Sequence, residues 1–193
     1  MNDFLLWFGT GFNHIVDWYA YDHILFLLVL CVPYSCKEKR PLFWLITAFT
    51  LGHSLSLALS VLGFVKIDSS IIEFLIPFTI LLTALYSLFY LGTHRAEKLA
   101  IKYAFTAGFG MIHGLGFSYL LRSMLGAQES IVFPLFAFNV GIEIGQIAIV
   151  TAIILWQSGL VLAFKWSQNK VALVFSALAS ILALILMIAR FPF

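Results

Sequence analysis

Charged residues are scarce in this chain: Asp, Glu, Lys and Arg make up 10% of its 193 residues, whereas hydrophobic residues make up 62%. Soluble domains carry about 25% charged residues, so the composition argues against an ordinary soluble fold. The formal net charge is only +2 and no basic stripe accompanies it, so no nucleic-acid partner is expected. The composition predicts instead that the lipid bilayer is the main partner.

Cysteine is also scarce, with only Cys31 and Cys36 present. Cys31 lies in an apolar run and Cys36 abuts the basic turn 37–40, so we expect no disulfide scaffold. Near the N-terminus, Asp3 stands where a signal peptide carries Lys or Arg, and the apolar stretch is short. We therefore expect no cleavable signal peptide, and residues 3–17 are expected to form a short amphipathic helix at the membrane interface.

Hydropathy predicts six membrane-spanning helices, each near the length of about 20 residues that crosses a bilayer. The predicted spans are 19–35, 41–63, 70–92, 100–122, 131–156 and 170–189. The expected fold class is an all-α polytopic membrane bundle of six transmembrane helices, with a short additional segment at the N-terminus. We expect a single transmembrane domain over residues 1–193, in which 1–18 form the interfacial helix and 19–189 the bundle.

The distribution of Lys and Arg predicts the orientation, because cytoplasmic loops are enriched in both. The turns after the first, third and fifth predicted spans contain eight basic residues: Lys37, Lys39, Arg40, Arg95, Lys98, Lys102, Lys165 and Lys170. The other side contains three: Lys66, Arg122 and Arg190. The sequence therefore predicts an integral protein of the bacterial inner membrane with both termini in the periplasm; a homo-oligomer is also compatible with it.

Six ionisable residues nevertheless lie inside the apolar runs, although a charged side chain costs about 2.5–3.5 kcal/mol there on insertion scales. They are Asp22, His23, His53, Glu73, His113 and Glu143. At about 1.5 Å per residue, all of them fall in the predicted outer half of the membrane or near its midplane. Imidazoles and carboxylates are ligands of divalent transition metals, and nickel, cobalt and zinc all accept this set. We therefore predict an intramembrane metal site formed by these six residues.

Helical phase places further polar groups near this site. Asn139 and Gln146 share the face of Glu143, at spacings of i, i+4 and i+7. The Gly-x3-Gly pairs around His113 and Glu143 predict that the fourth and fifth spans approach each other closely. His14 and Asp17, which precede the first span, are expected either to guard the entrance to the site or to cap the interfacial helix.

Five motifs in this chain occur in the order found in a known family. They are His14-Ile-Val-Asp-Trp-Tyr-Ala-Tyr-Asp22-His23, Phe49-Thr-Leu-Gly-His53-Ser, Ile72-Glu73-Phe, Phe109-Gly-Met-Ile-His113-Gly and Phe138-Asn139-Val-Gly-Ile-Glu143-Ile-Gly-Gln146. Over roughly residues 9–150 the chain resembles the HupE/UreJ family of small membrane proteins. The resemblance implies a nickel or cobalt permease linked to hydrogenase or urease maturation, with His14, Asp22 and His23 taking part in metal uptake.

The first motif departs from the family pattern. Seven residues, 15–21, separate His14 from the Asp-His pair, whereas the family motif has five. Two additional residues rotate a helix by about 200°. His14 therefore leaves the shared face unless the helix begins after it.

A metal-dependent hydrolase is the alternative function. In residue type, the three histidines, an acid and Ser54 are similar to the zinc-dependent alkaline ceramidase and adiponectin-receptor group. There His23, His53 and His113 would hold Zn²⁺, and Asp22, Glu73 or Glu143 would serve as general base for attack on a lipid amide or ester. Both functions require a metal site, and they differ in whether the metal is cargo or catalyst.

Overall fold

A computed structural model describes residues 3–93, 98–125 and 130–192. In these ranges all regular structure is helical and no strand occurs, which confirms the predicted all-α fold. The elements are α1 (Asp3–Val16), the 3-10 turn η1 (Trp18–Ala20), α2 (Tyr21–Cys31), α3 (Lys39–Val61), α4 (Ser69–Thr93), α5 (Leu99–Leu125), α6 (Val132–Phe164) and α7 (Gln168–Ala189).

Five helices in the described ranges, α3 to α7, are long and apolar enough to cross a membrane. The segments Asp3–Val16 and Trp18–Cys31 pass the same test only together, as a pair bent by 52°. The structure thus contains up to six spans if the bent pair counts as one. This is consistent with the helical membrane bundle that the sequence predicts.

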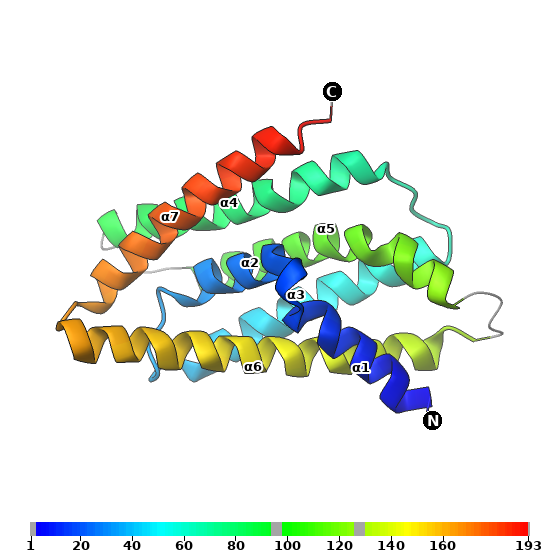
Figure 1. Cartoon of the computed structure of the whole chain (residues 1–193), viewed down its shortest axis with the longest axis horizontal. Helices are drawn as coiled ribbons and strands as arrows, with labels where there is room; N and C mark the ends of the chain where they lie inside the picture. Colours follow the sequence, from blue (N-terminus) through cyan, green and yellow to red (C-terminus); the bar gives the residue numbers. More distant parts are fainter. Residues whose placement is uncertain (1–2, 94–97, 126–129, 193) are drawn as a thin grey trace.

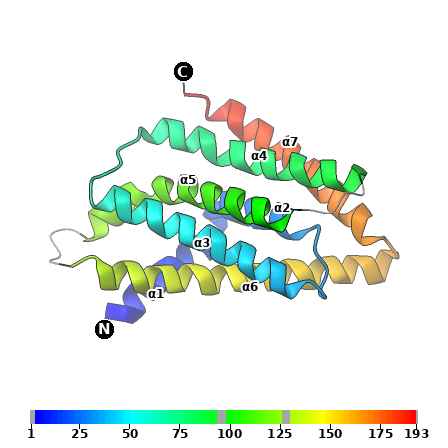
Figure 2. The ribbon, with the colours of Figure 1, turned by 180° about the vertical axis from the view of Figure 1, so that it is seen from behind.

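The helices lie side by side along the long axis of the molecule (Figure 1). The most extensive pairings are α3 with α5, α1 with α6 and α4 with α7. Seen from either side, α4 and α7 form one flank of the bundle and α6 with α1 forms the other (Figures 1 and 2). The short helix α2 lies between these flanks and contacts α4, α6 and α7.

The first segment differs from the expected continuous span over 19–35. Helix α2 has 11 residues, which at about 1.5 Å per residue cover only about 16 Å of a hydrocarbon core about 30 Å thick. Residues 3–16, expected as an interfacial helix, are packed against α6 and bury Trp7, Gly11 and Ile15. Helix α6 in turn extends to Phe164, eight residues beyond the predicted end of its span at 156.

Glycines determine which helices approach most closely, and the prediction for them was wrong. Gly110 and Gly114 of α5 contact α3 backbone at Phe49 and His53, rather than the fifth span. Gly141 of α6 contacts the backbone of Phe8 in α1. The spacing of the glycines predicted close approach correctly, but a single helix carries no information about which partner will face it.

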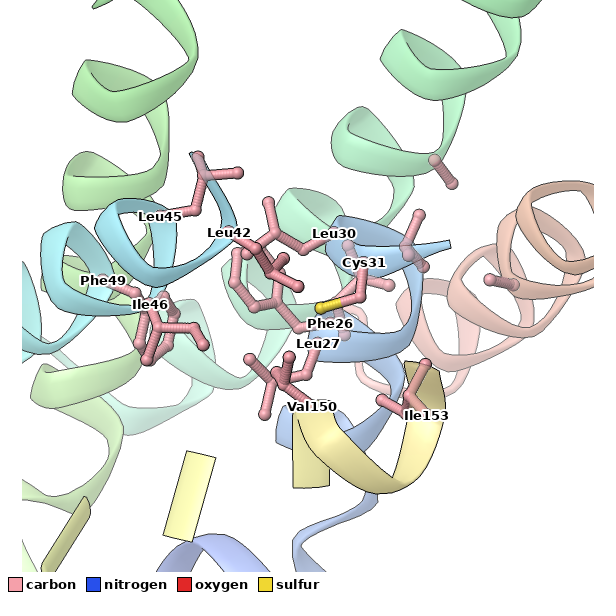
Figure 3. Close-up of a cluster of buried hydrophobic side chains, with 14 of the residues drawn as sticks. Phe26, Leu27, Leu30, Cys31, Leu42, Leu45, Ile46, Phe49, Val150 and Ile153 are labelled. Carbon is pink, nitrogen blue, oxygen red and sulfur yellow. The ribbon is translucent and has the colours of Figure 1, made fainter. Parts of the chain in front are cut away.

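Apolar side chains from several helices fill the bundle around α2. Phe26, Leu30 and Cys31 of α2 pack against Leu45 and other residues of α3 (Figure 3). Val150 and Ile153 of α6 close the cluster from another side. Each of these residues is at most 9% exposed. Helix α2 is therefore held by apolar contacts with several helices rather than by one partner.

A methyl group at Gly110 should separate α3 from α5. A Cβ built there meets the Phe49 carbonyl and the backbone nitrogen of His53, and overpacking of this kind costs about 1–3 kcal/mol. We expect Gly110→Ala to lower the thermal unfolding midpoint of the purified protein. Gly108→Ala is the matched control on the same helix, because nothing lies within 4 Å of its Cβ, and it should be neutral or slightly stabilising. Equal midpoints for the two variants would contradict the close α3–α5 contact.

Candidate metal centre

Three histidines from three helices form a group that can hold a metal ion. His14 lies in the last turn of α1, His23 in the first turn of α2 and His53 near the middle of α3. Each offers one ligand atom, and these atoms all lie within 4.8 Å of one another. The ring centroids of His14 and His23 are 4.9 Å apart, and those of His14 and His53 are 6.1 Å apart.

The break between α1 and α2 brings His14 into this group. Helix α1 ends at Val16, and the turn η1 follows before α2 begins at Tyr21. The Asp17 carboxylate accepts a hydrogen bond of 3.0 Å from the Tyr19 backbone N–H and so caps the turn. The condition set by the sequence, that the helix begins after His14, is therefore met, and Asp17 has a capping role at this break.

The ring nitrogens of the group fit metal ligation. Both nitrogens of His23, both of His53 and Nε2 of His14 are buried and have no hydrogen-bond partner in the structure. Buried polar atoms are almost always paired, so unpaired nitrogens on three rings that each offer one ligand atom within 4.8 Å of the others fit a bound metal ion. Imidazole nitrogens suit Ni, Co, Zn and Cu, and the donor set does not select among them.

His113 of α5 lies beside the group rather than within it. Its ring centroid is 5.1 Å from that of His23, and its Nε2 lies 3.2 Å from the Thr79 hydroxyl. The Thr79 hydroxyl donates to the Ile76 carbonyl at 2.7 Å, so its oxygen is assigned as the acceptor of a hydrogen bond from Nε2–H. That assignment leaves Nδ1 of His113 as an unprotonated, buried nitrogen without a partner.

The three predicted carboxylates lie outside the histidine group. Asp22 forms an ion pair with Arg190, with Oδ2 and Nη1 3.0 Å apart. Glu73 is exposed on α4. Glu143 is half-buried and accepts a hydrogen bond of 2.7 Å from the Thr47 hydroxyl. Among the described residues, the group within ligand distance therefore consists of histidines.

The remaining predicted residues have local roles. The Ser54 hydroxyl donates to the Thr50 carbonyl of its own helix at 2.6 Å. The Asn139 amide donates to the Leu135 carbonyl at 2.8 Å, which leaves its buried Oδ1 without a partner. Gln146 is fully buried and accepts a hydrogen bond of 2.7 Å from the Thr50 hydroxyl, and its Nε2 has no partner.

Comparison with known families decides the identity of the chain. A family model described as HupE / UreJ protein matches residues 1–191. The chain belongs to the HupE/UreJ family. No curated protein and no solved structure matches it. Membership and the long apolar helices together make this HupE/UreJ chain an integral membrane protein.

Two basic residues of this HupE/UreJ protein contact the helix bundle, although the sequence analysis assigned both of them to loops. Lys102, counted with a cytoplasmic turn, is only 6% exposed, and its Nζ lies 4.5 Å from the Tyr34 ring centroid. Arg190, counted with the outer side, reaches Asp22. One feature of the sequence indicated that these two residues could enter the bundle: both lie within a few residues of a span boundary. A residue there can face either the loop or the bundle.

Loss of the Thr50 hydroxyl should destabilise the α3–α6 contact. Thr50→Val removes the donor to a fully buried Gln146, and an unsatisfied buried amide costs about 1–3 kcal/mol. Thr151→Val is the control, because the Thr151 side chain is exposed and its hydroxyl donates only to the Ile147 carbonyl of its own helix. We expect the first variant to unfold at lower temperature and the control to stay within about 0.5 kcal/mol. The reverse order would argue against this buried pair.

Proposed function

We propose that this HupE/UreJ protein is a permease for nickel or cobalt, and that His14, His23 and His53 hold the divalent ion during its passage. The observation that carries the proposal is the position of the three rings at a break between two half-length helices. The relation of the HupE/UreJ family to nickel and cobalt is independent support for the proposed permease. The ion is cargo, so the chain has to bind it and also release it.

The broken first span supports transport. His14 lies at the end of α1 and His23 at the start of α2, and the two helices meet at an angle of 52°. Discontinuous helices that carry ion sites at their inner ends are typical of secondary transporters, because rocking of helices around such a site gives access from each side in turn. Rings on both sides of the break respond to any change in the angle between α1 and α2.

The donor set favours cargo over catalysis. A metallohydrolase of the alternative class needs a free carboxylate beside the metal to act as general base. Asp22 is paired with Arg190 and Glu143 accepts from Thr47, while the ligand group in the described part of the chain contains only histidines. These pairings support a site whose ligands already in place are neutral imidazoles.

The proposed orientation places the site toward the periplasm of the bacterial inner membrane, with both termini outside. Burial of Lys102 removes one residue from the eight basic residues counted inside, which leaves seven against three. The asymmetry in Lys and Arg still favours the same orientation.

Metal binding by the purified protein tests the proposed site. Titration with Ni²⁺ or Co²⁺ should detect one ion per chain, and His23→Ala or His53→Ala should weaken binding more than about 100-fold, since even residues behind the ligands change metal affinity 10–100-fold. His113→Ala is the matched control, because it removes a buried neighbouring imidazole outside the ligand group. It should weaken binding less than either His23→Ala or His53→Ala does.

Cellular accumulation distinguishes the two functions. In cells that express each variant, nickel or cobalt uptake should fall in step with the loss of binding. Metal binding without any uptake, together with turnover of a lipid amide or ester, would transfer the assignment to the hydrolase. Unchanged Ni²⁺ and Co²⁺ affinity in both His23→Ala and His53→Ala would rule out the proposed metal site.

The native cysteines test the orientation without any introduced cysteine. Cys36 is exposed and Cys31 is buried, so a membrane-impermeant maleimide should label one position only. We expect labelling in inside-out vesicles and none in intact spheroplasts, with Cys36→Ser as the control that abolishes the signal. Labelling of Cys36 from the periplasmic side would reverse the topology.

A further inference from the structure

Arg190 joins the end of α7 to the first turn of α2. Its Nη1 lies 3.0 Å from Oδ2 of Asp22, and its Nη2 donates a hydrogen bond of 2.6 Å to the Tyr21 hydroxyl. The guanidinium also lies 5.6 Å from the Tyr21 ring centroid. Burial lowers the pKa of Arg190, but Asp22 and Tyr21 raise it, and the net change is upward. The arginine therefore remains a full positive charge in this pair.

The carboxylate in this pair belongs to the residue before His23, and it lies outside the group of three histidines. Asp22 directly precedes His23 on α2, and its side chain is only 16% exposed. Arg190 binds one of its oxygens, while the other, Oδ1, is buried and has no hydrogen-bond partner. A buried carboxylate normally has both oxygens satisfied. Asp22 thus has one oxygen without a partner, and both ring nitrogens of the next residue, His23, are also unpaired.

A bound divalent ion would change the charge balance between the histidine group and the Asp22–Arg190 pair. Three neutral imidazoles leave both positive charges of a divalent ion uncompensated, and uncompensated charge is costly at membrane depth. With Arg190 in place, the Asp22–Arg190 pair contributes no net charge to the site. Without Arg190, the same carboxylate would contribute a negative charge directly beside His23.

The first turn of α2 has no side-chain cap. Its N-cap residue, Ala20, has no side chain that can accept from the first turn, and the turn η1 and the 52° bend come directly before it. A helix start without a side-chain cap leaves backbone N–H groups unsatisfied and is less stable than a capped one. A change of partner for Asp22 would require this turn to shift.

We propose that Arg190 and the transported ion compete for the Asp22 carboxylate. Arg190 binds the carboxylate while the site is empty, and a divalent transition-metal ion takes it as an additional ligand. The inference rests on the proposed function of the histidine group. It gives Asp22 two alternative partners, one on α7 and one in the site.

A double-mutant cycle measured by Ni²⁺ titration tests the competition. Arg190→Gln should tighten Ni²⁺ binding about twofold to fivefold, the range expected when a partly exposed ion pair no longer competes. Asp22→Asn should weaken it about tenfold or more. The gain from Arg190→Gln should shrink or vanish in the Asp22→Asn background. Weaker binding in Arg190→Gln alone, or an equal gain in both backgrounds, would overturn the proposal, because the first indicates a purely structural clamp and the second a general charge effect.

Chemical modification of the native protein provides a test that does not depend on folding of a variant. Phenylglyoxal modification of Arg190, followed by peptide mass spectrometry, should accelerate several-fold when Ni²⁺ is added. Arg122, which is exposed and belongs to the same predicted side, is the control and should not change. No acceleration, or protection of Arg190, would rule out the exchange. If the native protein does not bind Ni²⁺ or Co²⁺ at all, the proposed function fails; if it binds through His23 and His53 but Arg190 does not respond, only the competition fails.

Discussion

His23 lies nine positions after His14, and in an unbroken helix the two would lie about 13.5 Å apart along the axis and on opposite faces. The structure brings the two ring centroids to 4.9 Å by ending α1 at Val16 and beginning α2 at Tyr21. The whole candidate site depends on this interruption, because α3 then needs to supply only one further imidazole. Asp17 stabilises the interruption by accepting from the backbone of η1. The seven-residue spacing that departs from the family motif is thus compatible with a shared site.

The close helix contacts fix the third ligand as firmly as the break fixes the first two. Gly110 and Gly114 lie against the α3 backbone at Phe49 and His53, so α3 cannot rotate without a clash. His53 is fully buried at this contact, and His113 projects from the same pair of helices. Packing of backbone against backbone leaves little freedom for α3 and α5. The bent segment α1–α2 has no such constraint on its second half, since α2 is 11 residues long and contacts several helices.

The sequence predicted the long helices well because length and hydropathy are properties of one segment. The helices that contain His53 and His113 begin and end within a few residues of their predicted spans. Which side chains meet across helices was harder to predict. Helical phase placed Asn139, Glu143 and Gln146 on one face, but it does not predict which helix that face contacts. Glu143 pairs with Thr47 rather than joining the histidines. The partner of Asp22 lies 168 positions away in the chain, a separation at which periodicity carries no information.

A permease has to bind its ion strongly enough to strip its water and weakly enough to release it. Three neutral imidazoles with a carboxylate that is already engaged meet both conditions better than a site with several free carboxylates. Phe26 and Phe49 pack together beside His113, at centroid distances of 5.4 and 5.2 Å from its ring, and form an apolar barrier next to the site. The buried Lys102 lies over the Tyr34 ring. The proposed transport past such a barrier would require movement of helices around the site. Helix α2 carries both His23 and Phe26, and a change in its angle to α1 alters the ligand group and the barrier together.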